Sequence, residues 1–231
     1  MGAFKSITTF QDRKKNLKKP NIVGKWYGKK VLVIHPDDPT TRFLEPIYAK
    51  IPDKTVIRGG KTKEEICELI RSHDRILIMG HGSEDGLLAM GQFPGSDTYI
   101  VDSSMAGLLA TSSDSIFIWC NADKFVEEHG LNGFYSGMFI SEVGEAYFYG
   151  LPRTSQDIVD ESNRCFIEVM SRNIHLDAES IYRKIKRSSY KRLTRTNRVA
   201  YFNHNRLYCS SVNEELEDCK QGWQVWVDLY E

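Results

Sequence analysis

The sequence predicts an α/β fold in which helices flank a doubly wound, mostly parallel β-sheet. Short runs that are apolar on both faces recur along the chain, and such runs are typical of strands buried inside a parallel sheet. Segments with helical periodicity separate these runs, as expected for βαβ units. The chain has 231 residues, of which 41% are hydrophobic and 27% charged, and this suits one large domain.

Five strands of the central sheet are predicted in chain order. Four are the apolar runs at residues 31–34 (VLVI), 55–57 (TVI), 75–79 (RILIM) and 115–119 (SIFIW). A fifth strand is predicted at residues 137–140 (GMFI). Their lengths match ordinary strands and are too short for independent helices.

The first long helix is predicted to begin at Thr62. Thr62 and Glu65 have the spacing of a capping box, in which each side chain bonds a backbone N–H at the helix start. Ile66, Leu69 and Ile70 recur at helical spacing. These three residues would form the face that packs on the sheet.

The remaining elements complete a single domain over residues 30–231, preceded by a basic N-terminal arm at residues 1–29. The core of this domain is expected in residues 30–150, followed by a part with helices and small strands at 151–231. The other predicted elements are a hairpin over 86–101, a short helix over 103–111, helices over 154–172 and 177–193, and small strands near 199–203 and 223–229.

Charge and cysteine usage exclude several classes of protein. The 31 Lys and Arg residues balance 31 Asp and Glu residues, so no net field steers the chain towards nucleic acid or a membrane. No apolar run approaches the ~20 residues of a membrane span, and the N-terminus lacks the apolar stretch of a secretory signal. We therefore expect a cytoplasmic protein.

The sequence has five cysteines: Cys67, Cys120, Cys165, Cys209 and Cys219. Their odd number and the lack of a C-x-x-C pair disfavour a disulfide framework or a zinc site.

Reactive residues follow three of the predicted strands. The first strand runs into residues 35–38 (HPDD), the third into Gly80-His81-Gly82, and the fourth into Cys120. Open parallel sheets bind their ligands beyond the carboxyl ends of the strands. The sequence therefore predicts a site at this edge of the sheet.

His81 and Cys120 are the candidate reactive pair. A nucleophilic cysteine needs a neighbouring base and an N–H donor for the oxyanion that forms on attack. His81 is the candidate base, and the amide of Gly82 is a candidate donor. A lone cysteine at the end of an apolar strand is often only a small buried hydrophobe. The glycines on both sides of His81 and the matching strand positions favour a functional pair.

Residues 76–82 (ILIMGHG) followed by 116–120 (IFIWC) resemble the paired motifs of the caspase–hemoglobinase superfamily of cysteine peptidases (clan CD). The superfamily includes the CHAT-type proteins found widely in bacteria. In its members a hydrophobic strand runs into His-Gly, and the next buried strand runs into the nucleophilic cysteine. Residues 62–74 are similar to the helix that feeds the histidine strand, and the resemblance covers about residues 30–150.

The resemblance implies a Cys–His dyad with a caspase-like fold. Cys120 would be the nucleophile, and His81 would be the general base and later the general acid. The backbone N–H groups of Gly82 and Cys120 would form the oxyanion hole. No metal or organic cofactor is implied. The implied partner is a peptide or protein substrate, and an activator protein is an open option.

Acidic residues are candidates for the substrate pocket. In the family, the loop after the first strand helps to build the pocket for the residue before the cleaved bond. Here that loop carries Asp37 and Asp38, and Glu142 lies after the predicted fifth strand. Carboxylates at these positions would favour Arg or Lys in a substrate. Alternatively, Asp37 and Asp38 form a turn or cap the next helix.

The residues around Cys120 differ from the family pattern. Trp119 stands where the family has a small residue, and residues 121–123 (NAD) stand where it has a nearby glycine. A non-catalytic relative with the same fold, serving as a binding module, is therefore an alternative to an active peptidase.

Two further readings rest on other motifs. Residues 33–38 (VIHPDD), with His35, Asp37 and Asp38, are similar to the motif after the first strand of zinc-dependent N-deacetylases, although Pro39 replaces the usual Glu.

Residues 183–198 are rich in Lys and Arg and could bind phosphates or an acidic protein. The helical spacing of the apolar residues in this region favours instead an amphipathic helix with a solvated basic face, so nucleic acid is not expected as a partner.

Overall fold

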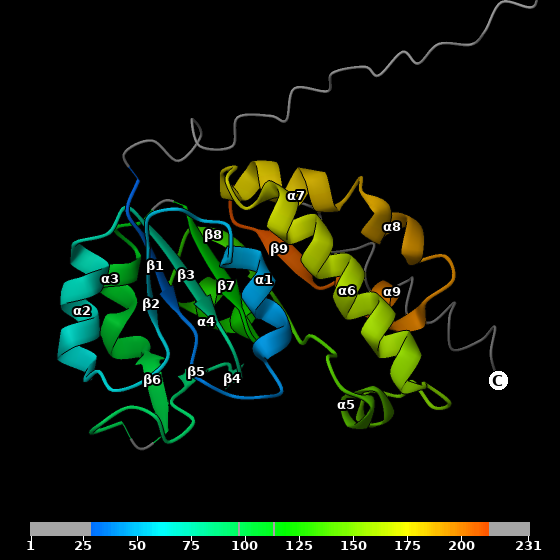
Figure 1. Ribbon diagram of the computed structural model, residues 1–231, viewed down its shortest axis with the longest axis horizontal. Helices are drawn as coiled ribbons and strands as arrows, with labels where there is room; N and C mark the ends of the chain where they lie inside the picture. The colour runs from blue at the N-terminus through cyan, green and yellow to red at the C-terminus, as the bar shows by residue number, and fades with distance from the viewer. Residues whose placement is uncertain (1–28, 97, 113, 213–231) are drawn as a thin grey trace, which may run out of the picture.

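The fold is a three-layer α/β arrangement in which helices cover both faces of a six-stranded sheet (Figure 1). The computed structural model describes residues 29–96, 98–112 and 114–212. The predicted strand near 223–229 and all of the predicted arm except residue 29 lie outside the described residues. The predicted α/β class with a mostly parallel sheet is confirmed.

The sheet has the strand order β2-β1-β3-β7-β8-β9. Neighbouring strands from β2 to β8 pair in parallel, and β9 adds an antiparallel edge. The first four predicted strands occur as β1, β2, β3 and β7. The strand bounds are β1 Val31–Ile34, β2 Lys54–Ile57, β3 Arg75–Met79, β7 Ser115–Ile118, β8 Gly133–Ser136 and β9 Leu207–Cys209.

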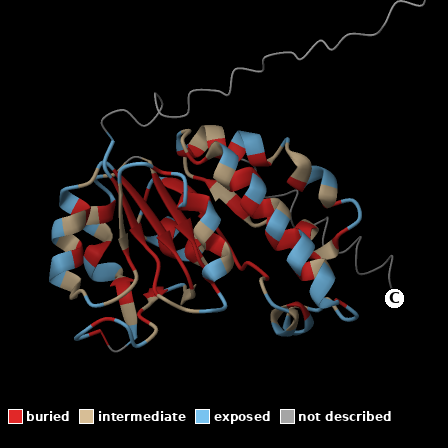
Figure 2. Cartoon of the chain, viewed as in Figure 1, coloured by how far each residue is buried: buried red, intermediate tan, exposed pale blue. Residues whose placement is uncertain are grey.

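Successive side chains of the central strands enter opposite cores because a strand alternates its faces. Val31 and Val33 belong to one core, whereas Leu32 and Ile34 belong to the other. All four are fully buried, and Figure 2 shows the central strands buried along their length. This burial on both faces explains why these strands have continuous apolar sequences.

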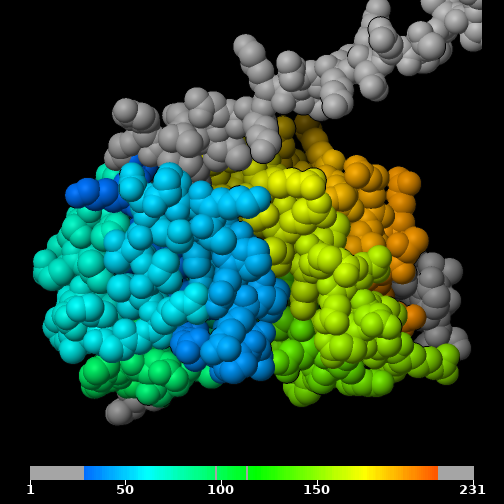
Figure 3. Space-filling view, viewed as in Figure 1, coloured from blue at the N-terminus to red at the C-terminus, as the bar shows by residue number. Residues whose placement is uncertain are grey.

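The two cores are covered by different helices. The core with Val31 packs against α1 (Glu45–Tyr48), α6 (Gln156–Asn173) and α7 (Ala178–Ile185). In Figure 3 the surface of α1, in blue, lies against that of α6, in yellow-green. The core with Leu32 packs against α2 (Lys63–Arg71), α3 (Ala106–Leu109) and α4 (Ala122–Glu128).

Helix α2 begins as the sequence predicts. The backbone N–H of Glu65 donates to the Thr62 hydroxyl over 3.3 Å, and the N–H of Thr62 donates to the Glu65 carboxylate over 2.9 Å. Ile66 and Ile70 are buried against the sheet, and Leu69 packs at the margin of the same core.

The strand order creates a crevice between the carboxyl ends of β1 and β3. The chain leaves β1 towards the face covered by α1, and it leaves β3 towards the face covered by α3. Connections that diverge in this way leave an opening between two adjacent strands, where open α/β sheets place their sites. The crevice lies between the loop after residue 34 and the loop after residue 79.

A small antiparallel sheet follows β3 directly. It contains β4 (Gly82–Ser83), β5 (Gly86–Leu88) and β6 (Tyr99–Asp102), so the predicted hairpin is present with an added strand. Gly86 has φ +143°, and a Cβ there would lie 2.0 Å from the Val101 carbonyl oxygen. A 3₁₀ helix at Ser103–Met105 leads into α3.

The predicted fifth strand is displaced along the sequence. The strand is β8 at Gly133–Ser136, and residues 137–140 form a loop instead. Gly133 pairs with Ser115 in β7, and a Cβ at Gly133 would lie 2.1 Å from the Ser115 carbonyl oxygen. Only a residue without a Cβ allows this close approach of the two backbones. Apolar content alone placed the strand wrongly at 137–140.

The C-terminal part also differs from the prediction. Residues 177–193 form two helices, α7 and α8 (Ser189–Leu193), because Ser188 caps a new helix by accepting the backbone N–H of Tyr190. Residues 199–203 lie in helix α9 (Arg198–His204) rather than in a strand. Asn197 caps α9 by accepting from the N–H of Ala200 over 2.9 Å. A short helix α5 (Val143–Phe148) lies between β8 and α6.

The basic stretch 183–198 is part of this amphipathic layer. Ile181, Ile185 and Tyr190 are fully buried, so the apolar face of α7 and α8 packs on the core. Arg183 pairs with Glu179 over 2.8 Å on the exposed face. Within the described residues, no helix combines the length and apolar character required to cross a membrane.

Candidate active site

His81 and Cys120 follow two neighbouring parallel strands at matching positions. Met79 of β3 pairs with Ile118 of β7, and the N–H of Gly80 donates to the Ile118 carbonyl oxygen over 3.1 Å. His81 and Cys120 therefore each lie two positions beyond the last paired residues of their strands. Gly80 has φ +143°, a conformation that favours glycine, and it turns the chain towards the crevice.

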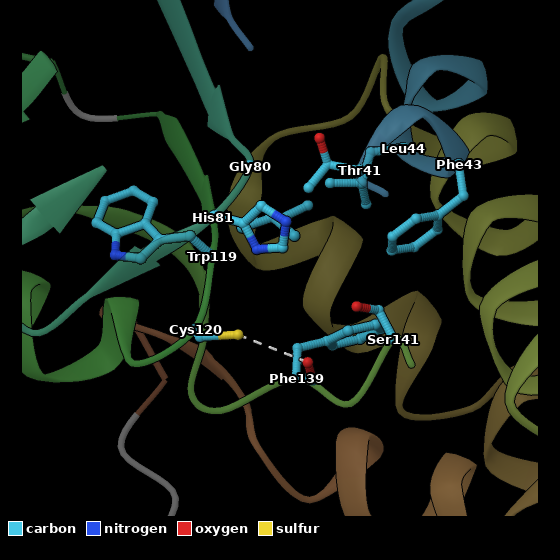
Figure 4. Close-up of a pocket in the computed structure, with 10 residues that line it drawn as sticks. Thr41, Phe43, Leu44, Gly80, His81, Trp119, Cys120, Phe139 and Ser141 are labelled. Carbon is cyan, nitrogen blue, oxygen red and sulfur yellow. Dashed lines mark hydrogen bonds between the residues drawn. The ribbon is translucent and has the colours of Figure 1, made fainter. Parts of the chain in front are cut away.

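The two side chains line one pocket (Figure 4). The pocket has a volume of about 20 Å³ for the centres of water molecules, which is room for one or two. One wall comes from the segment after β1, and the other comes from the loop after β8. The lining residues are Thr41, Phe43, Leu44, Gly80, His81, Ile118, Trp119, Cys120, Phe139 and Ser141.

A hydrogen-bond chain holds the imidazole of His81. Its Nε2 lies 2.6 Å from the Thr40 hydroxyl oxygen and 3.6 Å from the Asp38 carboxylate. The Thr40 hydroxyl donates its hydrogen to Asp38. Since that hydrogen is already used, Thr40 can only accept from His81. Nε2 therefore carries the ring hydrogen, and Nδ1 keeps a free lone pair.

The carboxylate of Asp38, the last member of this hydrogen-bond chain, is ionised. The Thr40 hydroxyl and the Thr40 backbone N–H, which donates over 2.8 Å, hold the pKa of Asp38 below its ordinary value. His81 lowers this pKa further. An ionised carboxylate favours a histidine that gains a proton at the other nitrogen. The arrangement can therefore support His81 as a base.

Cys120 is a neutral thiol in this conformation. Its Sγ donates to the Phe139 carbonyl oxygen over 3.6 Å, and no hydrogen bond joins it to His81 in the described chain. Burial raises the pKa of the Cys120 thiol to about 11, and Glu145 adds to the rise. The side chain is only half-buried, so the sulfur remains open to the pocket. The thiol must turn from Phe139 to reach His81.

The loop that bears Phe139 is fixed by a buried amide. Asn203 of α9 donates to the Ile140 carbonyl oxygen and accepts from the Ile140 N–H, both over 2.8 Å. Asn163 of α6 donates to the Ser141 carbonyl oxygen over 3.0 Å. Asn203 is fully buried, so the C-terminal helices hold this wall of the pocket in place.

Trp119 joins the histidine segment to the cysteine strand. Its indole N–H donates to the Ser83 carbonyl oxygen over 2.9 Å, and its ring packs between Phe117 and Phe125. A Cβ at Gly82 would lie 2.1 Å from the indole. The close approach at Gly82 is therefore to Trp119. Figure 4 shows the indole pointing away from the pocket, so this bulky residue leaves the thiol accessible.

Asn121 replaces the glycine that the resemblance would place after the cysteine. Its backbone is left-handed, with φ 65° and ψ 28°. Asparagine is one of the few residues that adopt this conformation readily. The chain can therefore turn sharply after Cys120 and enter α4 without a glycine at this position.

His35 is a structural residue rather than a free ligand. It is 1% exposed, its Nδ1 bonds the Tyr48 hydroxyl over 2.9 Å, and its Nε2 bonds the Thr41 hydroxyl over 3.1 Å. Burial, with a contribution from Arg58, lowers the pKa of His35 to about 4. Both nitrogens are thus committed, which disfavours the zinc-ligand role. Among the described residues, no group of three or more His, Cys, Asp or Glu side chains could hold a metal ion.

The candidate substrate carboxylates occupy three different settings. Asp37 pairs with Arg42 over 3.1 Å and with Arg58 over 3.8 Å, outside the pocket lining. Glu142 is exposed at the start of α5, where it forms a capping box with Glu145. Asp38 contacts the histidine network. The structure therefore brings only Asp38 close to the reactive pair.

Several site residues have no signal in the sequence. Thr40 lies in the loop after β1, and its role depends on where that loop meets His81. The Phe139 carbonyl and Asn203 come from distant parts of the chain. Only the tertiary fold brings them to the pocket.

No protein-family model, curated protein or solved structure matches this chain.

Proposed function

We propose that this chain is a caspase-like cysteine hydrolase of the clan CD type, acting on a peptide or protein. The observation that carries the proposal is the hydrogen-bond chain from Asp38 through Thr40 to His81, beside the Cys120 thiol. This chain of hydrogen bonds leaves the lone pair on Nδ1 of His81 free within the pocket. A base oriented by a third group is the general feature of an activated nucleophile.

The residues support an acyl-transfer sequence in two stages. The Cys120 proton passes to Nδ1 of His81 as the sulfur bonds to the substrate carbonyl carbon. The carbon–nitrogen bond then breaks, and His81 gives its proton to the leaving amine. Water, activated by His81, cleaves the thioester and restores the thiol.

The backbone N–H groups of Gly82 and Cys120 are the proposed oxyanion donors. Gly82 lies close to the Trp119 indole, which bonds the next residue, Ser83, and Cys120 starts the turn into α4. Fixed donors of this kind stabilise the negative charge that develops on the carbonyl oxygen. The proposed location is the cytoplasm, where thiols stay reduced, and the four free cysteines among the described residues support it.

A non-catalytic peptide-binding module with the same fold is the second candidate. It is favoured by the neutral thiol, whose pKa is about 11, and by the bond from this thiol to the Phe139 carbonyl. In this case the pocket would hold a peptide without forming a covalent bond.

Covalent labelling separates the two functions. The full chain is treated at neutral pH with a peptidyl chloromethyl ketone, and labelling is followed by intact mass. We expect the wild type to gain one label, Cys120→Ala to gain none, and His81→Ala to react at least about a hundredfold more slowly. His129→Ala is the matched control, because that histidine is only partly buried and lies outside the pocket lining. Equal rates for wild type and His81→Ala would overturn the catalytic proposal and leave the binding module.

A further inference from the structure

The size of the pocket limits what can reach the Cys120 thiol. The pocket opens to solvent on one side, and its volume of about 20 Å³ for water centres fits a hydrogen atom or a methyl group held inside it. The rings of Phe43 and Phe139 close the side opposite to Trp119 (Figure 4).

Among the described residues that line the pocket there is no Asp, Glu, Lys or Arg side chain. Phe43, Leu44, Ile118 and Phe139 supply its apolar walls, and Thr41 and Ser141 add hydroxyls. The nearby carboxylates are committed elsewhere. Asp37 pairs with two arginines, Asp38 accepts from Thr40, and Glu145 accepts from the backbone N–H and the hydroxyl of Ser141. A basic substrate residue would therefore lose its hydration without gaining an ion pair.

The walls are braced from behind, so the pocket does not widen easily. Phe139 packs on Phe166 with ring centroids 4.9 Å apart, and Asn203 fixes the next residue, Ile140. On the other wall, the buried His35 bonds the Thr41 hydroxyl. Protein interiors packed in this way resist expansion by even one methylene group.

From the size, the uncharged lining and the bracing of this pocket, we infer that the substrate residue before the cleaved bond is glycine or alanine. This inference rests on the proposed function, since it assumes that Cys120 attacks the carbonyl of that residue. It replaces the expectation of a basic residue at this position with a small, uncharged one.

The test compares acetyl-Ala-Ala-Xaa chloromethyl ketones with Gly, Ala, Leu, Arg or Asp as the last residue. In each reaction the Cys120 sulfur bonds to the methylene carbon, chloride leaves, and His81 takes the thiol proton. Each rate is divided by the rate of the same probe with glutathione. We expect the Gly and Ala probes to react at least about tenfold faster than the Leu, Arg and Asp probes.

Variants of the pocket wall make the test specific. Phe43 is only partly buried, so Phe43→Ala is expected to fold, whereas Phe139→Ala removes a core ring. Phe43→Ala should raise the rate of the Leu probe at least about tenfold and change the Gly rate by less than about threefold. Phe148→Ala, which removes an aromatic ring that is 82% exposed, is the matched control and should change neither rate.

The outcomes distinguish this inference from the proposed function. Labelling of Cys120 that depends on His81, but is as fast with Leu, Arg or Asp as with Gly, would overturn the small-residue preference alone. An unchanged Leu rate in Phe43→Ala would also overturn it. Failure of every probe to label Cys120 would overturn the proposed function, and this inference with it.

Discussion

Two histidines follow adjacent strands of one sheet, yet they differ in burial and in the number of ring nitrogens that are hydrogen-bonded. His35 comes directly after β1, and His81 comes two residues after β3, which pairs with β1 in parallel. The side chain of His81 is 28% exposed, and one of its nitrogens is held by Thr40. His35 is almost completely buried, and both of its nitrogens are bonded.

The difference shows that position at the end of a strand does not by itself make a histidine reactive. His35 is surrounded by Tyr48 and Thr41, and its lowered pKa keeps it neutral. It braces the wall of the pocket through Thr41. His81 has a free lone pair within the pocket because Thr40 occupies only Nε2. The number of committed nitrogens therefore separates a structural histidine from a candidate base.

Replacing each histidine by alanine tests this contrast in stability. His35→Ala should lower the free energy of unfolding by about 4 kcal/mol, because it leaves a cavity and strips two buried hydroxyls of a partner. His81→Ala should lower it by less than about 1 kcal/mol, because the side chain is partly exposed. Urea unfolding of both variants measures the difference. Equal losses would remove the contrast.

The buried histidine should also make stability depend on pH. The pKa of His35 is about 4 in the folded chain and near 6.5 when unfolded, so the unfolded chain binds more protons between these values. Stability should therefore fall as pH drops from about 6.5 to about 4, by about 3 kcal/mol from His35 alone. Denaturant titrations at several pH values should show this loss in the wild type but a smaller one in His35→Ala. Identical slopes in the two proteins would contradict the buried, neutral state of His35.

Thr40 tests how the exposed histidine is oriented. Thr40→Val keeps the shape of the side chain but removes the hydroxyl between Asp38 and His81. The labelling rate should fall about tenfold, which is less than the roughly 10²–10⁴-fold contribution of a general base, because His81 itself is still present. Thr40→Ser should restore most of the rate, since it keeps the hydroxyl. If Thr40→Val and wild type react equally fast, Thr40 does not position His81.

A substitution of Trp119 tests whether its indole anchors the segment that carries His81. Among these predictions it should have the smallest effect. Trp119→Phe removes the bond to the Ser83 carbonyl, which should cost about 1 kcal/mol of stability. The nitrogen NMR signals of His81 should shift, whereas those of His35 should stay unchanged. Shifts at both histidines would show that the indole supports the whole sheet edge rather than the His81 segment.

The sequence predicts the central sheet well because its strands are buried on both faces. Short runs such as VLVI at 31–34 are typical of strands buried on both faces, and the capping box at Thr62 is a purely local signal. The strand at 137–140 was predicted wrongly because its apolar residues line the pocket and the adjoining core as a loop. Residues 199–203 are predicted as a small strand, but the cap at Asn197 starts helix α9 there instead.

The candidate site was predictable only in part, for a related reason. Strand register brings His81 and Cys120 to one edge, and register follows from the apolar runs. The partners of these residues depend on long-range packing: Thr40 reaches His81 across 41 positions in the chain. Trp119 stands where the family pattern has a small residue, and the sequence does not show that its ring points to the opposite core.

The pH dependence of Cys120 alkylation tests the central claim most directly, that Nδ1 of His81 takes the thiol proton. Wild type and His81→Ala are labelled with the glycine chloromethyl ketone probe at pH values from 7 to 10. At pH 7 the wild type should react at least about a hundredfold faster, and the gap should close as the pH approaches the thiol pKa of about 11. The rate of His81→Ala should rise about tenfold per pH unit, since its thiol ionises without a base. Parallel profiles with equal rates in the two proteins would contradict the role of His81 as the base.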